Sequence, residues 1–87
     1  MPEISRFFGI VIMMYYDEHA PPHFHARYDG GQKASFTIET LDMIAGRVPA
    51  RVRGLVTEWA SIHTAELLED WELARSRVPL KKIDPLS

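Results

Sequence analysis

The sequence predicts a single α+β domain over residues 1–87: a small antiparallel β-meander of three or four strands, followed by two helices, or one bent helix, packed on one face. The first half of the chain has apolar, strand-like runs separated by turns, and the second half has an apolar stripe of helical period. The length of 87 residues allows one modest core but not two. The strand faces and the helix stripe each need an apolar partner, so we expect them to pack on one another.

The first strand is expected at residues 6–16, which are almost all β-branched, aromatic or otherwise apolar. Such a run is typical of a strand buried on both faces, with a bulge or close backbone contact at Gly9. Residues 17–22 are the connection. Its two adjacent prolines favour an extended backbone leading into a second strand at 23–28.

A turn and two further strands are expected next. The sequence Asp29-Gly30-Gly31 is a strong turn signal, because glycine accepts a positive φ without steric cost. A third strand follows at 33–39. A short fourth strand or turn is expected at 43–45, before Gly46.

The helical region extends from Val52 to Ala74, where apolar residues recur at steps of three and four. A single helix of that length would be long for so small a domain, so we expect a break near His63 and Thr64. Pro79 ends the helical region. The tail after it keeps three apolar residues that we expect to dock on the body: Leu80, Ile83 and Leu86.

Composition restricts the functional classes. The chain has no cysteine, which excludes disulfides and thiolate chemistry, so any metal must be held by histidine and carboxylate. The net charge of -2 argues against binding of nucleic acid over a broadly basic surface, but it is compatible with a local basic patch. We interpret the basic clusters at 47–53 and 75–82 as charge-mixed, solvated helix surface. No signal peptide or membrane segment is predicted, so we expect a cytoplasmic protein without membrane association.

The motif His23-Phe24-His25-Ala26-Arg27 marks the first candidate site. In a strand, His23, His25 and Arg27 share one face while Phe24 and Ala26 face the core. Two imidazoles projecting the same way suit zinc or a similar divalent ion that activates water for hydrolysis. The further ligands expected are His19 and one of three carboxylates: Asp17, Glu18 or Glu39. The alternative is a histidine-rich strand edge whose imidazoles only form hydrogen bonds.

A metal-free acid–base site is the second candidate. Histidine can move protons near neutrality, and Arg27 on the same face can hold a phosphate. His25 and Arg27 are the natural pair, with His23 or Glu39 as the second acid or base. Such a site would suit a small ribonuclease.

The helical region supplies the third candidate. Trp59 and Trp71 fall on the apolar stripe, and we expect them to be core residues whose indole N–H groups bond to backbone. His63 lies on the same stripe, where a lone histidine is usually a satisfied core residue. We assign no role to Glu58.

Five segments resemble a known family: 2–12, 21–26 with the motif Pro-Pro-His-Phe-His-Ala, 58–60 with His63, 67–74 and 79–83. The family comprises small bacterial proteins catalogued as domain of unknown function 4160. The resemblance covers essentially the whole chain. It implies a genomic neighbourhood similar to that of toxin–antitoxin pairs. Residues 41–44 depart from the glycine-containing turn expected of the family, which leaves the register of the fourth strand open.

The function predicted from these features is that of a component of a toxin–antitoxin-like module, acting through its histidine-rich strand and a protein partner. The alternative is a metal- or histidine-dependent hydrolase acting on RNA, with His23 and His25 central. A third interpretation is a structural or adaptor domain. The exposed edge of a small sheet also allows a homodimer.

Overall fold

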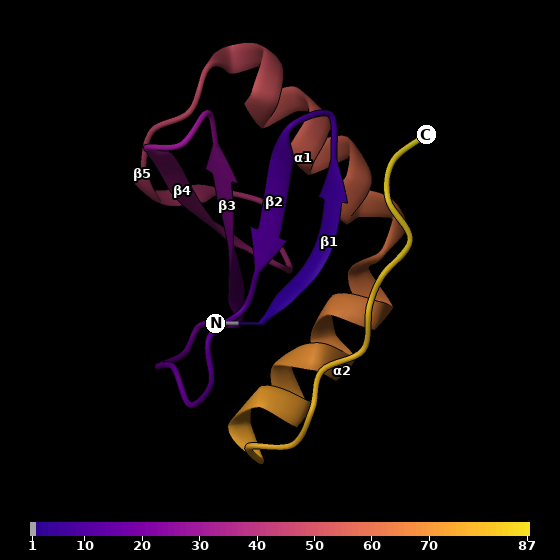
Figure 1. The fold of residues 1–87 in the computed structure, drawn as a ribbon. Coiled ribbons are helices and arrows are strands. Elements are labelled where there is room, and N and C mark those ends of the chain that lie inside the picture. The colour runs from indigo at the N-terminus through magenta and orange to yellow at the C-terminus, as the bar shows by residue number, and fades with distance from the viewer. Residues whose placement is uncertain (1) are drawn as a thin grey trace.

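The computed structural model describes residues 2–87 as a five-stranded antiparallel sheet with two helices packed on one face (Figure 1). The predicted α+β class, with a meander followed by two helices, is confirmed. The strands lie side by side in chain order. The elements are β1 (Glu3–Phe7), β2 (Ile10–Met13), β3 (His23–Tyr28), β4 (Gln32–Thr37), β5 (Met43–Gly46), α1 (Ala50–Ile62) and α2 (Thr64–Arg75).

Residues 6–16 contain a hairpin turn, so the prediction of a single buried strand is wrong. β1 and β2 pair antiparallel with Phe7 opposite Ile10, and only Phe8 and Gly9 connect them. Both connecting residues have positive φ, 49° and 78°, which matches the twist of a two-residue hairpin turn. Gly9 is therefore a turn residue, and the sheet has five strands because the first predicted strand is two.

The alternation predicted for β3 is confirmed by burial. Phe24 and Ala26 have no exposed surface and pack in the core, whereas His25 and Arg27 are half-buried on the opposite face. On β4, Phe36 lies opposite Phe24 and their rings stack with centroids 5.6 Å apart. The core therefore lies between the sheet and the helices, and the other sheet face carries His25 and Arg27.

The helix break falls at His63, as predicted, between α1 and α2. Trp59 of α1 is fully buried and contacts Phe7 and Phe24, with ring centroids 5.4 and 6.0 Å apart. Its indole N–H donates to the backbone carbonyl of Asp84 at 2.8 Å. Neither helix has the combination of length and apolarity needed to cross a bilayer.

The C-terminal tail docks on the body, as predicted. The buried Ile83 donates its N–H to the carbonyl of Ile4 at 2.8 Å, which covers the outer edge of β1. The Lys82 ammonium donates to the carbonyl of Glu3 at 2.7 Å. The tail runs beside α2 and past β1 (Figure 1). At the other end of the sheet, within residues 2–87, no strand pairs with the outer edge of β5.

Asp70 of α2 is a fully buried carboxylate that anchors this tail. Its Oδ1 accepts the backbone N–H of Lys81 at 2.9 Å, while its Oδ2 has no hydrogen-bond partner within the described residues. Burial raises the pKa of the Asp70 carboxyl above its ordinary value. The surroundings of Asp70 in the folded protein therefore disfavour the ionised form of its carboxyl group.

We expect Asp70→Asn to be more stable than the wild type at pH 7, because asparagine keeps the acceptor for Lys81 and removes the buried charge. The folded pKa of Asp70 lies above the unfolded one, so wild-type stability falls as pH rises through the interval between them. The advantage of the variant should therefore shrink on acidification through that interval. Urea unfolding at pH 7 and at acid pH measures it. Glu69→Gln, which removes an exposed charge, should change stability by less than about 1 kcal/mol at pH 7.

Candidate metal centre

The loop between β2 and β3 brings a carboxylate to the two histidines of the motif. Glu18 Oε1 lies 2.8 Å from Nε2 of His25 and 3.3 Å from Nε2 of His23. The three side chains each offer one donor atom, and all three donor atoms lie within 4.8 Å of one another. The structure therefore selects Glu18 from the three carboxylates that the sequence left open.

Each histidine is oriented by a hydrogen bond on its other ring nitrogen. His23 Nδ1 lies 2.8 Å from the carbonyl oxygen of Pro21. A carbonyl only accepts, so Nδ1 carries a proton, and in the neutral form of the ring Nε2 turns its lone pair toward Glu18. His25 Nδ1 lies 3.0 Å from the hydroxyl of Ser35, its partner on β4. Outer hydrogen bonds of this kind fix the tautomer of metal-ligating histidines.

The spacing of the three donors suits a cation. In the tautomer with its proton on Nδ1, His23 directs a lone pair at a carboxylate oxygen that is also 2.8 Å from His25. Protons on the Nε2 atoms of both rings, or a single metal ion, satisfy the two contacts. Ligands bound at about 2.0–2.2 Å lie roughly 3–3.5 Å from one another around a zinc-like ion. The 2.8 and 3.3 Å separations approach that spacing.

Aromatic rings enclose the two imidazoles. The ring of His23 lies 5.2 Å from that of Trp71 on α2, and the ring of His25 meets Tyr15 edge-on at 4.4 Å. The His23 side chain is only 11% exposed and that of His25 only 19%. Partial removal of water strengthens the interaction of these donors with a cation.

The sequence profile of a family described as Domain of unknown function (DUF4160) matches residues 9–72. The chain belongs to this family. The matched part contains Glu18, His23 and His25, so all three donors lie within the DUF4160 domain. No curated protein and no solved structure matches the chain.

The other predicted ligands of the DUF4160 domain lie elsewhere. His19 is exposed and is not among the three converging residues. Asp17 forms an ion pair with Arg77 at 2.7 Å. Glu39 is exposed beyond the end of β4. Of the predicted metal ligands, the structure thus brings His23 and His25 together with Glu18 alone.

A pocket of about 350 Å³ opens beside Glu18. It is lined by the loop and by α2, through Asp17, Glu18, His19, Ala20, Trp71 and Arg75. His19 therefore lies beside Glu18 in the lining of this pocket. The pocket makes Glu18 accessible from the side of the loop and α2.

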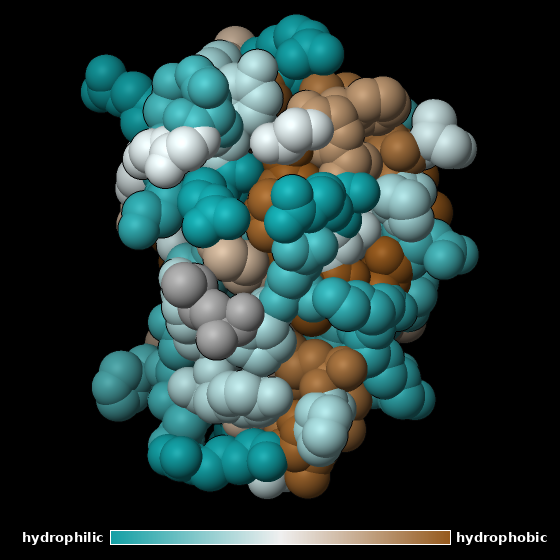
Figure 2. Space-filling model, in the orientation of Figure 1, coloured by the Kyte–Doolittle hydropathy of each residue, from teal (hydrophilic) through white to brown (hydrophobic). Residues whose placement is uncertain are grey.

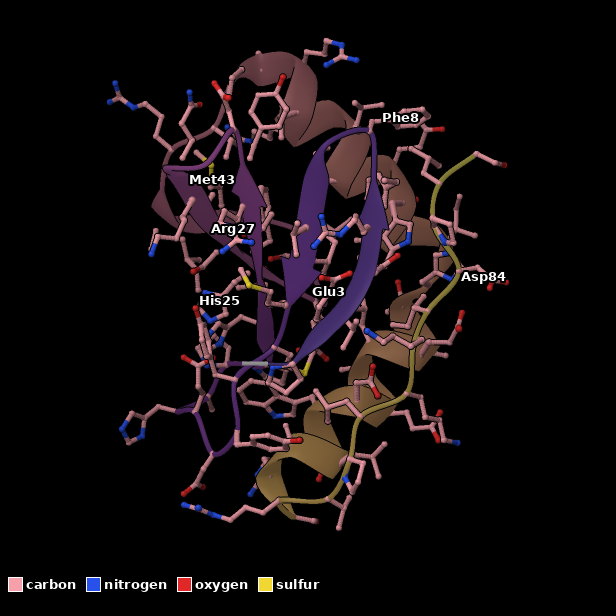
Figure 3. The ribbon with its side chains drawn as sticks, viewed as in Figure 1. Glu3, Phe8, His25, Arg27, Met43 and Asp84 are labelled. Carbon is pink, nitrogen blue, oxygen red and sulfur yellow. The ribbon has the colours of Figure 1, made fainter. Side chains whose placement is uncertain are left out.

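The acid–base candidates are only partly assembled. Arg27 projects from the same sheet face as His25, and both are half-buried (Figure 3). His25 and His23 are in ring contact, with centroids 5.2 Å apart. Glu39 is absent from the cluster that the structure describes.

The sequence reasoning missed two groups of the site, Ser35 and the carbonyl of Pro21. Ser35 was recoverable, because the Asp29-Gly30-Gly31 turn sets the pairing that places it opposite His25. The contact to Pro21 depends on the path of the loop and had no sequence signal. His63, by contrast, takes no part in this site. Its ring packs on Trp59 at 5.5 Å, and its Nδ1 bonds to Glu66 at 2.6 Å.

Proposed function

We propose that this DUF4160 protein binds a divalent transition-metal ion through Glu18, His23 and His25, and that it is a metal-dependent hydrolase. The observation that carries this proposal is the convergence of three donor atoms, together with the hydrogen bonds on Nδ1 that orient both histidines. Two imidazoles and a carboxylate form a ligand set of catalytic zinc sites, and also of iron(II) sites. Zinc is the ion to test first.

The hydrolytic role follows from the number of ligands. Three protein ligands leave at least one coordination position for water, whose pKa the ion lowers toward neutrality. An ion held by Glu18, His23 and His25 would supply an activated water for attack on an electrophilic atom of the substrate, and the leaving group would take up a proton as its bond breaks. The pocket beside Glu18 supplies access for the substrate.

We expect tag-free protein purified without chelator to contain about one zinc or similar ion per chain, measured by elemental analysis. Glu18→Gln keeps the shape of the side chain but removes its negative charge. It should weaken zinc binding, measured by calorimetry on the chelator-treated protein, by at least about 100-fold. Loss of a hydrogen bond to a ligating side chain lowers metal affinity about 10–100-fold, and loss of a ligand lowers it further. The same variant should lose any metal-dependent cleavage of an RNA substrate.

Glu66→Gln is the matched control, because Glu66 also contacts a histidine, His63, but in a pair without a third donor. It should leave zinc binding unchanged. His19→Ala tests the ligand that the structure leaves out and should also have little effect. A wild-type protein that takes up no ion, or a Glu18→Gln variant that binds zinc as well as the wild type, would contradict the proposal.

The role in a toxin–antitoxin-like module, with a protein partner, stays a prediction based on the family resemblance. It would need the histidines to be accessible to the partner. His23 is buried and His25 is half-buried, so a partner on this surface would first meet His19 and the loop around it. This burial favours the metal centre over a direct histidine-mediated contact.

A further inference from the structure

Four basic residues lie in one row across the sheet face away from the helices. The register places Arg6 opposite Val11, Val11 opposite Arg27, and Arg27 opposite Lys33. Arg47 continues this order directly after β5, because its N–H donates to the carbonyl of Lys33 at 2.8 Å. We call Arg6, Arg27, Lys33 and Arg47 the cationic row. The row extends from β1 to the end of β5, a width of about 19 Å at roughly 4.8 Å per strand, and Val11 occupies its position on β2.

Most of the charge in this row is unpaired. Arg6 forms an ion pair with Glu3 at 2.8 Å, and its hydrogen bonds lower the pKa of the Glu3 carboxyl. Within residues 2–87, no carboxylate forms an ion pair with Arg27, Lys33 or Arg47, although the charge of Arg27 also contributes to lowering the pKa of the Glu3 carboxyl. Like charges opposite one another on neighbouring strands repel. An anionic ligand relieves this repulsion.

The cationic row lies next to the proposed metal centre. Arg27 and His25 are two residues apart on β3, about 7 Å along one strand face, and both point away from the helices (Figure 3). The surface over the strands in this view is mainly hydrophilic (Figure 2). The chain as a whole has a net charge of -2, but basic residues gather on one face of the sheet beside the metal donors.

We propose that this sheet face binds the phosphodiester backbone of a single-stranded nucleic acid, with phosphates on the cationic row and the scissile phosphate at the metal centre. The position of the scissile phosphate rests on the proposed function, whereas the contacts with the row do not. The face of this sheet presents no helix or two-stranded ribbon that could enter a duplex groove. A single strand can lie across a positively charged surface and make several phosphate contacts.

The test is fluorescence anisotropy with a labelled single-stranded RNA of about 12 nucleotides, a length within the site sizes of such surfaces. The protein is chelator-treated, so that neither a bound ion nor cleavage contributes. Arg27→Gln/Lys33→Gln is compared with Arg51→Gln/Arg53→Gln, which removes the same charge from exposed positions on α1. We expect the first pair to weaken binding at least about tenfold and the second less than about twofold.

The salt dependence gives a second readout. Four phosphate contacts predict a slope of log affinity against log salt near about -2.8, which should fall to about -1.4 in Arg27→Gln/Lys33→Gln. Equal losses in the two double variants, or no binding by the wild type, would overturn the inference. A duplex bound as tightly as the single strand would also overturn it. Single-stranded DNA bound as well as RNA supports a backbone ligand, and preference for RNA adds a contact with the 2′-hydroxyl.

Elemental analysis of the same variants separates the two proposals. Arg27→Gln/Lys33→Gln should retain the metal content of the wild type, because neither residue donates to the centre. If the wild-type protein contains metal but binds no RNA, only the proposal of a nucleic-acid surface is refuted. If it binds RNA through the cationic row but contains no metal, only the proposal of a metal centre is refuted.

Discussion

Gly46→Ala is expected to destabilise the protein by more than about 3 kcal/mol. Gly46 ends β5 with a φ of +77°, a conformation that costs alanine about 1–2 kcal/mol by itself. A Cβ at this position would also lie 2.1 Å from the carbonyl oxygen of Lys33 and 2.9 Å from Cα of Ala34. These atoms belong to the backbone of β4, so the clash can be relieved only by moving β5 away from its neighbour.

Urea unfolding followed by tryptophan fluorescence measures this loss. Gly31→Ala is the matched control, because Gly31 has no heavy atom within 4 Å of the added Cβ and no positive φ. It should unfold at nearly the wild-type urea concentration. If both variants proved equally stable, the close approach of β5 to β4 described by the structure would be incorrect.

Removal of residues 80–87 is the second change with a large expected effect, a loss of about 3–5 kcal/mol. Burial of Ile83 contributes about 1.5–3 kcal/mol, and the Asp70 carboxylate loses the hydrogen bond from Lys81, which costs a further 1–3 kcal/mol. The indole of Trp59 also loses its acceptor at Asp84. Hydrophobic contact, a buried charge and an indole N–H therefore all depend on the same tail.

Thermal and urea unfolding of the truncated protein measure this effect. Deletion of Ser87 alone, which is exposed, is the control and should be neutral. Ile83→Ala should fall between the two, at about 2–4 kcal/mol, because it keeps the backbone contacts of the tail. A truncated protein as stable as the wild type would show that the docked tail contributes nothing to folding.

Local pattern was sufficient to predict most of the fold. The alternation of β3 and the stripe of α1 and α2 are carried by residues that repeat at strand and helix periods, and the structure follows both. The β1–β2 hairpin was missed because its turn consists of Phe8 and Gly9. Phenylalanine is atypical at a positive φ, and the apolar run continues through it without a polar residue.

The candidate site was located by sequence but not completed by it. His23 and His25 share a face because of strand geometry, which the motif itself specifies. The identity of the carboxylate depends on how the loop returns toward β3, and adjacent loop residues face different ways. Glu18 meets both imidazoles, whereas its neighbour His19 is exposed. No local sequence pattern predicts which of these two adjacent loop residues faces the histidines.

Charged residues were the least predictable part of the sequence. Asp70 belongs to an acidic run of the sequence, which is typical of solvated surface, although it lies three residues after Leu67 and four before Ala74, on the buried stripe. Arg47 was grouped with the helix cations Arg51 and Arg53. The structure instead pairs its backbone with Lys33, and this long-range contact creates the cationic row.

The two edges of the sheet differ, and this difference limits how copies of the chain can associate. The tail lies along the edge at β1, while no strand of residues 2–87 pairs with the edge at β5. Two copies that join through β5 leave no free edge, so growth stops at the pair and cannot continue into a fibre. Loss of the tail exposes a second edge on every chain. The docked tail therefore blocks the addition of a further strand at β1, and it also packs against the core.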